Sequence, residues 1–146
     1  MQNSTLNSTL ASTRKILTAA VITASLTFSI AAPVLSQAHT VVYFDSGNDN
    51  AFLRSSITGN EYHDYILNAQ AGQKMGVSLI TEGTAYFNIL PPGSSGEAIY
   101  NSSISGNDAT GISLPQNGNY TIRVYLMGND KDSNQTVPFS LSASIL

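Results

Sequence analysis

Two segments near the end of the chain alternate between apolar and polar residues with a period of two. The first covers residues 120–127 and the second residues 137–145. Successive side chains of a β-strand point to opposite faces of its sheet, so this alternation predicts two strands with one buried and one solvated face. The apolar positions are Tyr120, Ile122, Val124, Leu126, Val137, Phe139, Leu141, Ala143 and Ile145. A chain with this ending is constrained to a sheet whose apolar face is covered by a second layer.

Shorter segments of the same character precede these two. Apolar, β-branched and aromatic residues gather at residues 40–44, 52–58, 63–69, 75–80, 86–90, 98–100 and 111–114. Gly, Asn, Asp and Pro separate them at intervals of about ten residues, as is typical of antiparallel sandwiches and barrels. No segment after residue 38 shows the 3.6-residue period of a helix. The sequence therefore predicts an all-β fold, a single antiparallel β-sandwich of about eight strands. Pro138 lacks an N–H, so the last strand is predicted to begin at an edge or a bulge.

The first 38 residues have a different pattern, which is that of an export signal. Arg14 and Lys15 precede an apolar run over residues 16–32, and small residues at Ser36 and Ala38 follow Pro33. This order of positive, apolar and small residues is typical of a secretory signal peptide. A retained membrane anchor is the alternative, although the run is short and contains several Thr and Ser. The sequence predicts a signal peptide over residues 1–38, a mature domain over residues 39–146 and a periplasmic or secreted location, with membrane contact only for export.

Composition excludes several classes of function. The chain has no Cys, which rules out a disulfide framework, a thiolate metal site and a cysteine nucleophile. Residues 39–146 hold four Lys and Arg against nine Asp and Glu, a net charge of −5. That balance argues against nucleic acid as a partner. No cofactor is expected.

Three segments carry a family resemblance: residues 65–73, 86–93 and 114–127. Their order and spacing resemble the periplasmic inhibitors of g-type lysozyme, the PliG-like family. More distantly, they resemble the bacterial pre-peptidase C-terminal domain. The resemblance runs from about Val41 to Ile145. It implies a β-sandwich that binds another macromolecule, either a lysozyme or another extracytoplasmic partner, and that does no chemistry of its own.

The resemblance also implies where binding residues lie. In the family, a Tyr directly after the Gly before the third strand and two Arg in a later loop, spaced R-N-x-A-R, enter the acidic cleft of the lysozyme. Here Asn60 follows Gly59, and Tyr62 comes two positions later. Gly128 and Asp132 stand at the positions of the two Arg. An Asp there would meet a carboxylate with like charge, which lowers affinity. The loop candidates are therefore Asn60, Tyr62, Asn129 and Lys131.

Arg123 and Tyr125 are candidates of another kind. They occupy alternate positions of one strand and therefore share its outer face. Tyrosine presents an apolar ring and a polar hydroxyl, which suits protein interfaces and sugars. A carbohydrate- or envelope-binding module, similar to pre-peptidase C-terminal domains, is thus the alternative function. Ordinary pairing on a sheet surface is the structural explanation of the same residues.

Two further patterns contain residue types that occur in metal or catalytic sites. Asp130, Asp132 and Asn134 place oxygen ligands at alternate positions, as a calcium loop does, but Gln135 and Leu141 replace its turn Gly and bidentate Glu. A solvated turn explains them equally well. His63 and Asp64 lack a matching nucleophile motif, and the chain has no G-x-S-x-G elbow. The sequence therefore predicts a binding protein and not an enzyme, with calcium as a weak possibility only.

Overall fold

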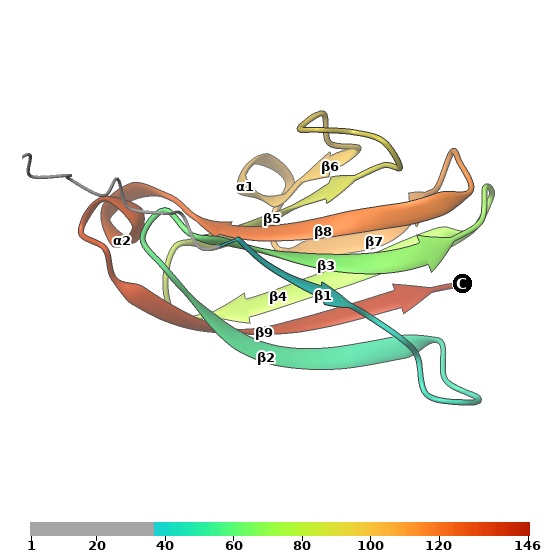
Figure 1. The fold of residues 1–146 in the computed structure, drawn as a ribbon, viewed down its shortest axis with the longest axis horizontal. Coiled ribbons are helices and arrows are strands. Elements are labelled where there is room, and N and C mark those ends of the chain that lie inside the picture. The colour runs from blue at the N-terminus through green and yellow to red at the C-terminus, as the bar shows by residue number, and fades with distance from the viewer. Residues whose placement is uncertain (1–36) are drawn as a thin grey trace, which may run out of the picture. The chain divides into compact units, whose positions relative to one another are not determined.

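A computed structural model describes residues 37–146, which form two sheets packed face to face (Figure 1). One sheet has five strands in the order β1-β3-β8-β5-β6, and the other has four in the order β2-β9-β4-β7. The strands are β1 (Gln37–Val41), β2 (Asn50–Thr58), β3 (Tyr62–Ala69), β4 (Lys74–Thr81), β5 (Ala85–Leu90), β6 (Tyr100–Asn101), β7 (Asp108–Ser113), β8 (Gly118–Leu126) and β9 (Thr136–Ile145). The predicted all-β sandwich is confirmed, with one strand more than the eight expected.

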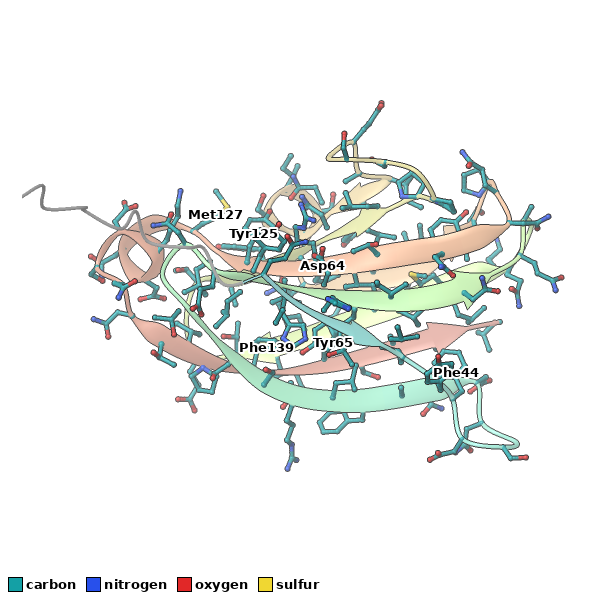
Figure 2. The ribbon with its side chains drawn as sticks, in the orientation of Figure 1. Phe44, Asp64, Tyr65, Tyr125, Met127 and Phe139 are labelled. Atoms are coloured by element: carbon teal, nitrogen blue, oxygen red, sulfur yellow. The ribbon has the colours of Figure 1, made fainter. Side chains whose placement is uncertain are left out.

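The core lies between the two sheets and follows the alternation of the sequence. Every inward residue of β8, from Tyr120 to Leu126, is buried, and so is every inward residue of β9, from Val137 to Ile145. Across the four-stranded sheet, Leu141 lies in register between Leu53 and Leu79. Tyr65 of the five-stranded sheet meets Phe139 of the other sheet edge to face, with ring centroids 6.3 Å apart (Figure 2). Burial of these side chains supplies the main stabilisation of a domain without disulfides.

The first strand departs from the predicted antiparallel pattern. β1 pairs with β3 in parallel, with Gln37 opposite Tyr62 and Val41 opposite Ile66. A parallel pair needs a crossover connection, and here β2, in the other sheet, provides it. β1 also starts three residues before the predicted segment at Thr40. The predicted signal peptide lies outside the described residues except for Gln37 and Ala38, which belong to β1.

Two one-turn helices interrupt the strands. They are α1 (Ser102–Ser105) and α2 (Gly128–Asp132). Each is too short to produce a 3.6-residue period, which is why the sequence pattern did not reveal them. Asn101 caps α1, because its side chain accepts a hydrogen bond from the Ser103 N–H at 3.0 Å. The buried Ser102 hydroxyl accepts the Phe87 N–H at 2.7 Å and so satisfies a backbone donor of β5.

The prediction that the last strand begins at an edge holds only for its first residues. β9 is an interior strand with β2 and β4 on its two sides. Pro138 pairs with Ser56 of β2, but the pairing of β9 with β4 ends one residue away, where Phe139 faces Thr81. At Pro138, β9 is paired with β2 but not with β4. The missing N–H of the proline therefore removes no hydrogen bond between β9 and β4.

Within residues 37–146, no helix has the length and apolar content needed to cross a membrane.

His63 ties the edge strand β1 to β3. Its Nε2 lies 2.9 Å from the Thr40 hydroxyl, and its ring stacks on Tyr65 with centroids 4.3 Å apart. Burial lowers the pKa of His63 below its ordinary value, and nearby His39 lowers it further, while Asp64 opposes both. The unfolded chain therefore binds this proton more readily than the folded one, and stability is lost as the pH falls through the lowered pKa.

We expect the free energy of unfolding to decrease between pH 7.5 and pH 5.5, and His63→Gln to flatten this decrease. Urea unfolding at several pH values within this window measures the slope. His39→Gln should reduce the slope less than His63→Gln, because the exposed His39 makes only a minor contribution to the lowered pKa of His63. An equal slope in the wild type and His63→Gln would contradict the assignment to His63.

Candidate binding site

Three connections meet at one end of the sandwich, around α2 (Figure 1). They are the β2–β3 turn at residues 59–61, the β4–β5 turn at residues 82–84 and the segment 127–135 that contains α2. We call these residues the tip. The Gly59 N–H donates to the Gln135 carbonyl at 3.1 Å, and the hydroxyls of Thr58 and Thr136 lie 2.9 Å apart. The tip is therefore one connected surface built from segments far apart in the sequence.

The contact between Gly59 and Asn134 shows how closely two of these loops approach. Gly59 has a φ of +53°, and a Cβ atom there would lie 2.2 Å from Oδ1 of Asn134. Asn134 itself has a φ of 55°, a left-handed conformation that Asn tolerates better than most residues. Glycine at position 59 is thus required by both backbone conformation and space.

Asp130 joins the third loop to the tip. Its Oδ2 accepts the Thr84 N–H at 2.7 Å and the Thr84 hydroxyl at 2.9 Å. The Met127 N–H donates to the Thr84 carbonyl at 3.0 Å, which closes the junction from the other side. The carboxylate therefore holds the β4–β5 turn against α2. This structural role explains an acidic residue here without a metal ion.

We expect Asp130→Asn to lower the free energy of unfolding by about 1–2 kcal/mol, because it weakens a charged acceptor shared by two donors. Asp132→Asn is the matched control, since Asp132 belongs to the same helix and makes no hydrogen bond among the described side chains. Denaturant unfolding of both variants measures the difference. Equal stability of the two variants would show that the Thr84 contacts contribute nothing.

The candidate site residues fall into two groups. Asn60, Asn129 and Lys131 are exposed on the tip and lie on the loops that the structure brings together. Tyr62, Arg123 and Tyr125 lie instead on the outer face of the five-stranded sheet, where Figure 2 shows Tyr125 and Asp64. The calcium candidates Asp130 and Asp132 are in α2, and Asn134 follows it. Among residues 37–146, no three His, Cys, Asp or Glu side chains gather closely enough to hold a metal ion.

Arg123 makes the main polar contacts of the sheet group. Its Nε and Nη2 donate to the two carboxylate oxygens of Asp64, both at 2.8 Å, and Asp64 is only 6% exposed. The guanidinium lies 4.1 Å from the centre of the Tyr62 ring. Hydrogen bonding to Asp64 is the main cause of the raised pKa of Arg123. The pairing of Arg123 with Asp64 could not be predicted from the sequence, because it depends on the β3–β8 register.

The tip carries more acidic than basic side chains. Its residues include four acids, Glu61, Glu82, Asp130 and Asp132, and a single cation, Lys131. One oxygen of Glu61 accepts the Thr58 N–H at 3.2 Å, and Asp130 is held by Thr84. Glu82 and Asp132 are exposed. A partner at this surface therefore meets amides, one ammonium group and several carboxylates.

These features define a small β-sandwich protein with a loop tip at one end. No family model matches the chain. The inhibitor of g-type lysozyme of Escherichia coli strain K12 is 30% identical over 105 residues, which cover 71% of this chain and 78% of that protein. The chain belongs to the family of inhibitors of g-type lysozyme, as the sequence resemblance predicted.

Solved structures of inhibitors of g-type lysozyme resemble this fold. That of PliG from Aeromonas hydrophila, a periplasmic inhibitor of g-type lysozyme, has a TM-score of 0.70 and 34% identity, over 75% of this chain and 97% of that one. That of PliG from Salmonella Typhimurium has a TM-score of 0.60 and 31% identity, over 75% and 98%. The predicted periplasmic or secreted location is confirmed by these periplasmic relatives, which are inhibitors and not enzymes.

The more distant resemblance also holds at the level of the fold. The pre-peptidase C-terminal domain of a Bacillus anthracis collagenase matches with a TM-score of 0.54 and 14% identity, over 78% of this chain and all of that one. At this identity the likeness concerns the two-sheet architecture alone.

Proposed function

We propose that this protein is a non-enzymatic binding protein that contacts a lysozyme of the g-type through its tip. The observation that carries the proposal is the junction of three loops at one end of a family sandwich. Gly59, Asn134, Asp130 and Thr84 interlock these loops, so the tip is preorganised and loses little conformational entropy on binding. Asn60, Asn129 and Lys131 are the exposed side chains through which contact is made.

The chemistry of contact differs from that implied by the family pattern. No guanidinium extends from this tip, because Gly128 and Asp132 stand at the two Arg positions and Arg123 is held by Asp64 on the sheet. Tyr62 does not extend from the loop either, since its ring lies against Arg123. Binding then depends on amide hydrogen bonds and the ammonium group of Lys131. We expect weaker inhibition than guanidinium groups would give in an acidic cleft.

Several observations support a role without catalysis. His63 and Asp64 are neighbours in a strand, so their side chains point to opposite faces of the sheet. His63 is engaged with Thr40 and Tyr65, while Asp64 is engaged with Arg123. The two residues therefore do not form an acid–base pair.

A titration of lysozyme activity tests the proposal. The protein, purified after export, is added to g-type, c-type and i-type lysozymes acting on cell walls. We expect inhibition of the g-type enzyme at micromolar concentrations and little effect on the other two. No inhibition of any lysozyme would refute the proposal and leave the fold unaffected.

Sequencing the N-terminus of the same preparation tests the signal cleavage, which we propose to leave His39 as the first residue.

A further inference from the structure

A row of three tyrosines crosses the outer face of the five-stranded sheet. In the register of the sheet, Tyr125 of β8 lies opposite Tyr62 of β3 on one side and Tyr86 of β5 on the other. The rings of Tyr86 and Tyr125 have centroids 6.5 Å apart. Three neighbouring strands span about 10 Å, so the three side chains are distributed over that length of the sheet. We call Tyr62, Tyr125 and Tyr86 the tyrosine row.

The next row of outward side chains, Asp64, Arg123 and Asn88, contacts the tyrosines. Arg123 packs its guanidinium against Tyr62, and the Tyr125 hydroxyl donates to Oδ1 of Asn88 at 3.3 Å. Asp64, Arg123 and Asn88 are themselves in register across the same three strands. Two of the three rings therefore have a fixed neighbour in the adjacent row, which reduces the entropy lost when a ligand orders them.

Among the outward residues of β3, β8 and β5, the face around the row carries no uncompensated charge. The outward residues of β3, β8 and β5 include one acid and one base, Asp64 and Arg123, and these two neutralise each other. Further along the face, Asn68 donates to Asn119 at 2.8 Å. The edge of the Arg123 guanidinium formed by Nε and Nη2 is occupied by the two oxygens of Asp64. The tip, in contrast, has an excess of acidic groups.

We propose that the tyrosine row binds a neutral sugar chain. The argument is complementarity of charge and shape. On the outward face of β3, β8 and β5, the one cation and the one carboxylate neutralise each other, which favours a neutral ligand over a charged one. A sugar ring presents C–H groups that pack on aromatic faces and hydroxyls that pair with phenols and amides. The row borders the tip, because Tyr62 directly follows Glu61, and Tyr86 and Tyr125 lie two positions from Thr84 and Met127. Sugar binding on the row does not require lysozyme binding at the tip.

An NMR titration with a neutral N-acetylglucosamine hexamer tests the proposal. We expect the amide signals of β3, β8 and β5 next to the tyrosine row to shift, with binding in the submillimolar range. Tyr86→Leu and Tyr125→Leu keep apolar volume but remove the ring, and each is expected to weaken binding about tenfold. Tyr43→Leu is the matched control, because Tyr43 is 82% exposed outside the row. A sulfated heparin hexasaccharide is expected to cause no shifts.

Three results would overturn the proposal. One is the absence of shifts with the neutral hexamer at millimolar concentration. Another is equal weakening by Tyr43→Leu and the two row variants. The third is a loss of lysozyme inhibition in the row variants without any sugar binding, which would make the row part of a protein interface. Loss of inhibition by tip variants alone, with sugar binding intact, would leave the proposal standing, so the two functions fail separately.

Discussion

Replacing Arg123 with Ala is expected to lower the free energy of unfolding by about 2–3 kcal/mol, because it leaves the buried Asp64 carboxylate without its partner. Asp64 is 6% exposed, and both of its oxygens accept from Arg123. This expected loss of free energy is small for a buried ion pair, because the Arg123 side chain is 28% exposed and partly hydrated. Urea unfolding at pH 7 measures the change.

A double-mutant cycle separates the pair from the packing of Arg123 on Tyr62. Asp64→Ala is expected to cost much less in the Arg123→Ala background than in the wild type. Arg123→Lys keeps the charge but loses the two-pronged geometry, so its stability should lie between those of the wild type and Arg123→Ala. Additive effects of the two alanine substitutions would contradict a direct interaction between Asp64 and Arg123.

The second large effect is expected at the tip. Asp132→Arg reverses an exposed charge at the position where the family resemblance places an Arg. It should raise the affinity for a g-type lysozyme about tenfold, because a guanidinium pairs with carboxylates through charge-assisted hydrogen bonds. Lys131→Ala should lower it about threefold, since an exposed charge contributes little. Inhibition constants from lysis assays measure both changes.

Arg54→Ala is the control for these variants. Arg54 is an exposed cation on β2, on the outer face of the four-stranded sheet and outside the tip. Its loss changes the net charge of the protein as Lys131→Ala does, so an effect of net charge alone would appear equally in both. Unchanged inhibition in Asp132→Arg would contradict contact between the end of α2 and an acidic surface.

Most strands could be predicted because burial imposes a period of two. β8 and β9 each bury every second residue, and the sequence shows this directly. The parallel pairing of β1 could not be predicted, because it depends on β2 crossing to the other sheet. Pro138 indicated the one-sided start of β9 but not its interior place in the sheet. A proline in a sequence shows that one backbone N–H is missing. It does not show which neighbouring strand ends there, and here β4 ends opposite Phe139.

The candidate site was predicted in part. Loop residues Asn60, Asn129 and Lys131 were named from the family pattern, and the structure places their loops together. The partners that shape the site were missed. Thr84 holds Asp130, and Asp64 holds Arg123, across 46 and 59 positions of sequence. Such pairs follow from strand register and loop packing, which no local pattern encodes. Tyr62 was assigned to the loop but lies on the sheet, against Arg123.

Hydrogen exchange of the complex with a g-type lysozyme tests the central claim, that the tip is the contact surface. We expect slowed exchange at residues 59–61, 82–84 and 128–135 when the lysozyme is added. Residues 43–49 and 70–73, in loops at the other end of the sandwich, should exchange at the same rate with and without it. Protection of those loops, or of the tyrosine row alone, would contradict the claim.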